Sequence, residues 1–269
     1  MDENETLQQR ARDTECLENR ISENVVSQEV DFVKWIFDRL TVKAGSWILE
    51  LCCGTGLQTV PFAERIGKKG QVVALDVSKE ALGKLASKLD TDQLLRLTLV
   101  ETDMDLLSES LNGIGLFPPT FDLVFCAYGL YYSANVKRTL QETKKWLKPG
   151  GLVAIVGPYG PNNGPLFEVL EQSGVRIPDG VRHSSQSVMG KDVIPWAVQN
   201  FEKVVIDTMI NRIKWSSADQ ILRYWENSTF YQEEKLKEVQ IRLNAFFGKH
   251  EVFVNEKWIM MVQMHNARI

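Results

Sequence analysis

A glycine-containing turn follows the first strongly apolar segment of the sequence. The segment WILEL (47–51) leads into CCGTG (52–56), and we expect a helix to begin near Leu57. A turn between a strand and a helix directs free backbone N–H groups toward a ligand, and glycines let the ligand approach the main chain. The turn is therefore a candidate binding site, although a pair of glycines is by itself a weak signal.

An acidic residue ends the next apolar segment. Asp76 closes QVVALD (71–76), and a carboxylate at the end of a second strand binds ribose hydroxyls in nucleotide-binding α/β folds. The pair predicts a ligand that contains adenosine, either a dinucleotide or S-adenosylmethionine. The dinucleotide pattern GxGxxG is incomplete because Thr59 stands where its third glycine would be, so NAD is disfavoured.

Five short apolar segments recur at a spacing that fits one strand and one crossover helix each. They are WILEL (47–51), QVVALD (71–76), LRLTLV (95–100), FDLVFCA (121–127) and GLVAIV (151–156). Segments that are apolar nearly throughout are typical of parallel strands covered on both faces, so we predict a doubly wound α/β sheet. Ligands bind at the carboxyl ends of such strands, where Glu50, Asp76, Asp103 and Cys126 follow their segments.

The ordered motifs WILELCCGTG, VVALDVS, ETDMDLL, FDLVFCAYGLYY and LKPGG cover about residues 45–157. Together they resemble the class I S-adenosylmethionine-dependent methyltransferases, particularly the group that methylates small molecules and quinone rings. The resemblance implies a Rossmann-like, doubly wound, seven-stranded and mostly parallel sheet with an antiparallel last strand. It also implies N-terminal helices, a helical lid or insertion, and S-adenosyl-L-methionine as the cofactor.

The resemblance also assigns residues to the cofactor. Glu50, Gly54 and Gly56 match the motif that holds its methionine part, Asp76 matches the ribose-binding acid, and Asp103 with Met104 matches the pair at the adenine. Cys52 stands where the family usually has glycine, so its side chain would crowd the amino-acid end of the cofactor. The predicted cofactor-binding residues are Glu50, Cys52, Gly54, Gly56, Asp76, Val77, Asp103, Met104 and Cys126.

Methyl transfer from a sulfonium depends more on the orientation of donor and acceptor than on acid–base catalysis, because the leaving group becomes neutral. Orientation supplies roughly 7 to 11 kcal/mol of barrier lowering. Two residues are candidates for catalysis: His183, flanked by Arg182 in the predicted lid, as a general base, and Tyr128 as part of the acceptor pocket. The alternative for His183 is an ordinary solvated loop histidine. Strand-terminal His265 is a weaker candidate.

The flanking segments complete the predicted organisation. Residues 1–44 are expected to form an N-terminal arm and helix, with 1–20 as a loosely docked or frayed arm and one helix over about 22–40. Residues 45–269 form the methyltransferase domain, with a lid loop at 157–190 that is irregular over 174–190, and a helical insertion at 215–249 between strands 201–213 and 251–265. Ser217 to Gln220 predicts a capping box. A group of aromatic residues in the insertion is expected to pack in a core, with the lining of a lid as the alternative: Trp215, Tyr224, Trp225, Phe230 and Tyr231.

Composition and motifs limit which partners and cellular locations we expect for the protein. The net charge of −4 offers no basic excess for nucleic acid, and FCAYGL lacks the Asn-Pro-Pro-Tyr type motif of enzymes that methylate bases. Uncharged stretches are broken by prolines, so no membrane span is predicted. The acidic, polar N-terminus lacks the pattern of a secretory signal, which favours a cytoplasmic location. Four cysteines without CxxC spacing predict neither a metal site nor disulfides.

We therefore expect a methyltransferase that acts on O, N or C of a small organic acceptor. The alternative is a catalytically silent protein of the same fold that binds the cofactor or a partner subunit, because a fold alone does not establish activity. The acceptor and the oligomeric state are not predicted.

Overall fold

The computed structural model describes residues 9–10 and 12–267, and the chain divides into two compact units. The sheet unit comprises residues 36–157, 188–208 and 260–269, and the helical unit comprises residues 1–35, 158–187 and 209–259. Two of the boundaries between the units fall inside the strands β6 (Lys203–Trp215) and β7 (Phe253–His265). The predicted role of 157–190 as a lid, and the predicted domain boundary at residue 45, stay predictions.

The strands form one seven-stranded sheet in the order β3-β2-β1-β4-β5-β7-β6. Besides β6 and β7, they are β1 (Trp47–Leu51), β2 (Gln71–Asp76), β3 (Leu97–Glu101), β4 (Phe121–Ala127) and β5 (Leu147–Pro158). The first five are parallel to their neighbours. The N–H of Gly150 donates to Ala267 O and the N–H of Asn266 to Gly151 O, so β7 runs antiparallel to β5. The predicted fold class is confirmed.

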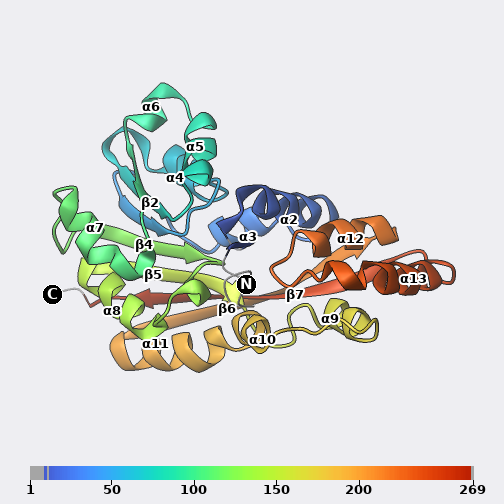
Figure 1. Ribbon diagram of the computed structural model, residues 1–269. Coiled ribbons are helices and arrows are strands. Elements are labelled where there is room, and N and C mark those ends of the chain that lie inside the picture. Colours follow the sequence, from blue (N-terminus) through green and yellow to red (C-terminus); the bar gives the residue numbers. More distant parts are fainter. Residues whose placement is uncertain (1–8, 11, 268–269) are drawn as a thin grey trace. The chain divides into compact units, whose positions relative to one another are not determined.

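Burial explains why the apolar segments became the central strands. Ile48, Leu49 and Leu51 of β1 have no exposed surface, because β1 lies between β2 and β4 and side chains on both sheet faces are covered. Helices α4 and α5 lie beside β2 (Figure 1). The helices wholly in the sheet unit are α4 (Thr59–Arg65), η1 (Gly67–Lys69), α5 (Lys79–Ser87), α6 (Thr91–Leu94), η2 (Met104–Leu106), α7 (Leu107–Gly113), η3 (Leu130–Tyr132), α8 (Val136–Trp146), η4 (Met189–Val193) and α11 (Ile194–Asn200).

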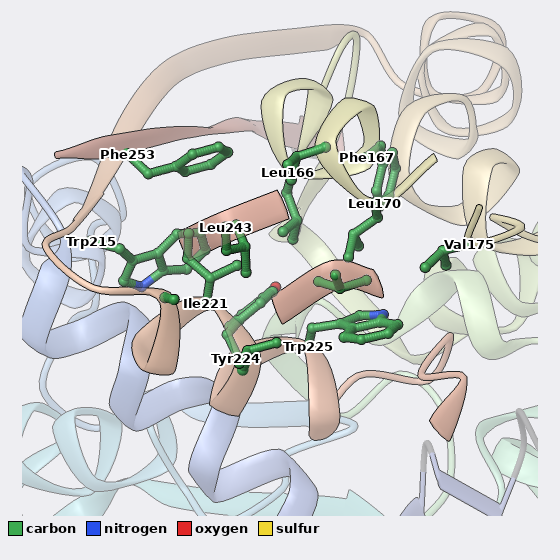
Figure 2. Close-up of a cluster of buried hydrophobic side chains, with 14 of the residues drawn as sticks. Leu166, Phe167, Leu170, Val175, Trp215, Ile221, Tyr224, Trp225, Leu243 and Phe253 are labelled. Carbon is green, nitrogen blue, oxygen red and sulfur yellow. The ribbon is translucent and has the colours of Figure 1, made fainter. Parts of the chain in front are cut away.

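The helical unit has an apolar core of its own. Its helices are α2 (Thr14–Ser27), α9 (Gly164–Glu171), α10 (Asp179–Gln186), α12 (Ala218–Glu226), η5 (Glu233–Lys235) and α13 (Leu236–Phe247). Figure 2 shows side chains from β6, β7, α9, α12 and α13 directed into this cluster, with Trp215, Tyr224 and Trp225 among them. The prediction that the aromatic residues of the insertion pack in a core is confirmed.

The predicted single helix over about 22–40 is wrong. The structure has α2, which ends at Ser27, and a separate α3 (Phe32–Phe37). Between them Gln28 pairs with Ile213, and the N–H of Val30 donates to Asn211 Oδ1 at 2.9 Å. Hydrogen bonds to β6 therefore replace the helical ones that the apolar spacing predicted.

The predicted frayed arm over 1–20 is wrong for its second half. Residues 14–20 belong to α2, whose N-terminus is capped by Asp13 through a hydrogen bond from the N–H of Cys16 at 2.9 Å. Arg20 donates to Asn227 O at 2.9 Å, which fixes the helix to the end of α12. Residues 1–8 and 11, on which the rest of that prediction falls, lie outside the described residues.

The predicted irregular structure over 174–190 is also wrong in part, because α10 occupies 179–186 and η4 begins at Met189. Asn162 Nδ2 donates to Ser185 Oγ at 2.8 Å, and Asn162 Oδ1 accepts the N–H of Trp258 at 3.0 Å. The segment after β5 is thus attached to both α10 and β7 inside the helical unit. These contacts between distant residues stabilise a helix that the local sequence does not indicate.

The predicted cap of α12 is half correct. Ser217 Oγ accepts the N–H of Gln220 at 3.4 Å, as a capping box requires. The return bond comes instead from the N–H of Ser216, which donates to Gln220 Oε1 at 2.8 Å.

Candidate functional site

The glycine-containing turn and the acid after β2 meet in the sheet unit. The N–H of Gly54 donates to Asp76 Oδ2 at 2.8 Å, and the N–H of Ser78 donates to Asp76 Oδ1 at 2.9 Å. Each carboxylate oxygen keeps acceptor capacity beyond these bonds. Asp76 therefore holds the turn in place while it can still accept a bond from a ligand hydroxyl.

Two glycines give the turn a backbone conformation that other residues rarely adopt. Gly54 has φ of 53° and Gly56 has φ of 87°, a backbone region that favours glycine. A Cβ on Gly56 would lie 2.3 Å from Leu85 Cδ1 of α5. Gly56 thus lets the turn approach α5 closely, a packing role beside the predicted contact with the cofactor.

Glu50 is a buried carboxyl at the end of β1. Its side chain is 1% exposed, and Oε2 has no hydrogen-bond partner among the described residues. Burial raises the pKa of Glu50 to about 8; the nearby Thr59 hydroxyl offsets part of that rise, and the charge of Asp76 adds to it. Thr59 Oγ1 itself lies outside hydrogen-bond geometry to any described partner.

This orphaned oxygen tests whether the residues fit the predicted cofactor. A buried acid without a partner costs free energy unless a cationic or hydrogen-bonding group meets it. The α-ammonium of S-adenosylmethionine is such a group, and the resemblance assigns Glu50 to the methionine part of that molecule. The residues therefore fit the cofactor.

The residues assigned to the adenine lie in the segment after β3. Asp103 Oδ1 accepts the N–H of Asp105 at 2.9 Å and so caps η2. Met104 is 6% exposed, and its Sδ lies 4.0 Å from Cys52 Sγ. The structure thus brings Met104 to the glycine-containing turn. Val77 lies directly after β2 and is partly exposed.

Asp105 is a site residue that the sequence reasoning missed. It accepts hydrogen bonds from Ser133 Oγ at 2.6 Å, from the N–H of Ala134 at 2.8 Å and from Thr139 Oγ1 at 2.9 Å. Burial raises the pKa of Asp105, but these bonds and the charge of Arg138 outweigh it and hold the pKa below its usual value. Asp105 fastens the segment after β3 to the one after β4. The acid-rich motif ETDMDLL was its only sequence signal.

The fourth strand contributes Cys126 and Tyr128. Cys126 has no exposed surface and is paired in register with Leu51 of β1. The neighbouring Cys126 thiol, together with burial, raises the pKa of Cys52 well above its usual value, so this thiol stays protonated. Tyr128 has φ of 54°, and its N–H donates to Val156 O at 2.9 Å.

The two histidine candidates belong to different units of the chain, His183 to the helical unit and His265 to the sheet unit. His183 is exposed in the last turn of α10, in the helical unit, so the predicted loop position is wrong. Burial and the charge of Lys203 lower the pKa of His265 at the end of β7. A catalytic role for either histidine stays a prediction. Across residues 9–10 and 12–267, no three His, Cys, Asp or Glu side chains gather as a metal-binding group.

Comparison with known proteins shows what the segment that contains the candidate site is similar to. Residues 48–151 match the family model described as a methyltransferase domain. The demethylmenaquinone methyltransferase of Lactobacillus johnsonii is 31% identical over 144 residues, which cover 54% of this chain and 56% of that protein. The enzyme of the same description from Staphylococcus epidermidis is 33% identical over 149 residues, 55% of this chain and 58% of that protein. The chain thus matches a little over half the length of these relatives.

Solved structures support the fold over a longer part of the chain. The YcgJ protein of Bacillus subtilis covers 88% of this chain and 98% of its own, with a TM-score of 0.57 and 14% identity. A putative methyltransferase from Bacillus halodurans covers 88% and 99%, with a TM-score of 0.56 and 15% identity. Residues 48–151, which contain both the glycine-containing turn and Asp76, are therefore similar to a methyltransferase domain, and they supply most of the sheet ordered β3-β2-β1-β4-β5-β7-β6.

Proposed function

We propose that the protein transfers a methyl group from S-adenosyl-L-methionine to oxygen, nitrogen or carbon of a small organic acceptor. One observation carries the proposal: the buried Glu50 carboxyl has an unpaired oxygen at the end of β1, next to a turn that Asp76 fastens through Gly54. The relatives named as demethylmenaquinone methyltransferases make a quinone ring the first acceptor to test.

The cofactor supplies a methyl group on a positively charged sulfur, which leaves as a neutral thioether. The chain's own task is to hold the two reactants in line, a contribution of roughly 7 to 11 kcal/mol. Glu50 would bind the ammonium, Asp76 the ribose hydroxyls, and Asp103 with Met104 the adenine. The fixed turn after β1 keeps these groups in place before binding, which lowers the ordering cost.

A proton-accepting group adds only about 10²- to 10⁴-fold, and only where the acceptor must lose a proton. We keep His183 as the proposed base and Tyr128 as the proposed acceptor-pocket residue. Replacing His183 by Gln would lower turnover with phenol-like acceptors and leave cofactor affinity unchanged if this assignment holds.

Cofactor affinity is the direct test of the proposal. S-adenosylhomocysteine should raise the melting temperature of the purified protein, and NAD should not, because a ligand stabilises only the state that it binds. Transfer of labelled methyl groups to a demethylated quinone, followed by a panel of small phenols and amines, then tests activity. Absence of any stabilisation by S-adenosylhomocysteine or S-adenosylmethionine would refute the proposal.

One observation favours the silent alternative. Cys52 occupies a left-handed backbone position, φ 54°, within the turn assigned to the amino-acid end of the cofactor. Binding of S-adenosylmethionine without transfer to any acceptor in a cell extract would support a scaffold role. Measurable transfer would exclude it.

A further inference from the structure

Cys52 shares its left-handed backbone conformation with Gly54 and Gly56 of the same turn, but it carries a side chain that the structure must accommodate. It is one of three non-glycine residues with positive φ among residues 9–10 and 12–267. A residue with a Cβ in this region carries strain of about 1 to 2 kcal/mol. Its surroundings must therefore accommodate the side chain well.

Gly129 provides that place. A Cβ built on Gly129 would lie 2.3 Å from Cys52 Cβ and 2.6 Å from Cys52 Sγ, separations that real atoms do not adopt. Gly129 is buried and has φ of −127°, an ordinary value for any residue. Space for Cys52, and not backbone conformation, is thus what requires glycine at this position.

Two other residues enclose the thiol. Cys126 Sγ lies 3.3 Å from the same Cβ position on Gly129, and Met104 Sδ lies 4.0 Å from Cys52 Sγ. Both residues are buried. Cys52 itself is only half-buried, so the direction left open to a displaced side chain is the exposed side of the turn. Under the proposed function, that side belongs to the amino-acid end of the cofactor.

We infer that Gly129 is a positioning residue for cofactor binding. By lacking a Cβ, it holds the Cys52 side chain beneath the turn and keeps the amino-acid end of the cofactor site open. The inference rests on the proposed function. It also explains how this chain tolerates cysteine where the family usually has glycine.

A mutant cycle tests the inference, with affinity for S-adenosylhomocysteine measured by calorimetry. G129A should bind about tenfold more weakly or worse, a loss of at least about 1.4 kcal/mol. C52G should bind at least as tightly as the wild type, and C52G/G129A should return to within about twofold of C52G, because the clash is gone. G83A is the matched control: a Cβ there meets nothing within 4 Å, and its affinity should not change.

Measurements of folding stability test the steric contact between Gly129 and Cys52 independently of ligand binding. Without ligand, urea unfolding should show that G129A is destabilised and that C52G restores it. If G129A does not fold, C52A/G129A replaces it, since this variant keeps only the Cβ–Cβ contact, and it should bind more weakly than C52G/G129A. Wild-type affinity in G129A, or no rescue by C52G, would overturn the role of Gly129. If the wild-type protein has no affinity for S-adenosylhomocysteine, the proposed function is overturned, and with it the role of Gly129 in cofactor binding. The stability measurements would in that case still show whether Gly129 and Cys52 are in steric contact.

Discussion

At the scale of single residues, the site combines one carboxyl that has an unpaired oxygen with one whose two oxygens each accept a backbone hydrogen bond. Glu50 is buried with an orphaned oxygen, whereas both oxygens of Asp76 accept backbone N–H bonds. Burial raises the pKa of Glu50, whereas the two backbone hydrogen bonds to Asp76 fix the position of its carboxylate. The two acids therefore suit different parts of one ligand, a cation for Glu50 and hydroxyls for Asp76.

Glu50 should make folding stability depend on pH. Its pKa is about 8 in the folded protein and near the ordinary 4.5 in the unfolded chain. The folded state therefore holds an extra proton between these values, so its contribution is intact below pH 4.5, declines as the pH rises, and is lost above about pH 8. E50Q should lack this decline, and urea unfolding from pH 5 to pH 9 checks it. A constant difference between wild type and E50Q across that range would contradict the assigned burial effect.

Asp76 should couple ligand binding to the turn. D76A removes the acceptor for Gly54 and Ser78 and the proposed ribose ligand together, so S-adenosylhomocysteine should no longer raise the melting temperature. D90A is the control: Asp90 caps α6 through the N–H of Gln93, so this variant should lose about 1 kcal/mol of stability and keep the full ligand-induced shift. An unchanged shift in D76A would count against the ribose assignment.

At the scale of elements, connections after the strands are fixed by side chains from other connections. Asp105 joins the segment after β3 to the loop that begins α8, and Gly129 after β4 makes room for Cys52 after β1. β1 and β4 are parallel neighbours, which brings Gly129 to Cys52. β3 and β4 are separated by β2 and β1, so Asp105 links the ends of strands that are not neighbours in the sheet. The site is therefore held by contacts among loops, each supported by a buried strand.

The Asp105 contacts should contribute to stability above about pH 3.8 and lose this contribution in strong acid. D105A loses three hydrogen bonds to one carboxylate and should destabilise the protein by about 2 kcal/mol. The pKa of Asp105 lies below its usual 3.8, so this contribution is present above pH 3.8 and is lost as the pH falls through the lower folded value. Urea unfolding of wild type and D105A at pH 7 and in acid measures the difference. A gap of the same size in strong acid would show that packing, and not charge, is the cause.

At the scale of the whole molecule, two units with their own apolar interiors share strands β6 and β7. The helical unit packs α9, α12 and α13 around Trp215 and Trp225, neither of which has exposed surface (Figure 2). The predicted cofactor residues all lie in the sheet unit. No described helix has the length and apolar character that crossing a membrane requires.

Core damage in the helical unit should stay local. L243A removes a fully buried side chain of α13 and should cost about 2 to 5 kcal/mol. Hydrogen exchange should accelerate in α12 and α13, while the amides of β1 and β2 keep their protection, because each compact unit can open separately. I241A, on the same helix but 60% exposed, is the control and should change little. Equal acceleration in β1 would show that the two units unfold together.

The sequence by itself determined the sheet and the strand ends at which we propose the site. Apolar segments such as 47–51 and 71–76 alternate with helix-length connections, and a strand–helix–strand unit places successive strand ends at one edge through local geometry alone. Glu50, Gly54 and Asp76 could be placed from that pattern, and the strands near 201–213 and 251–265 were found within a few residues.

Tertiary structure decided what depends on partners far away in the chain. Residues 28–30 are not helical because Gln28 and Val30 form hydrogen bonds with β6. Helix α10 forms where Asn162 donates a hydrogen bond to Ser185. In the sequence, Gly129 is only one residue of the motif FDLVFCAYGLYY, and the tertiary structure shows that it lies against Cys52. Local propensity is a weak preference of tenths of a kcal/mol per residue, whereas a buried clash or an unpaired buried group costs about 1 to 3 kcal/mol, so contacts between distant segments settle these positions.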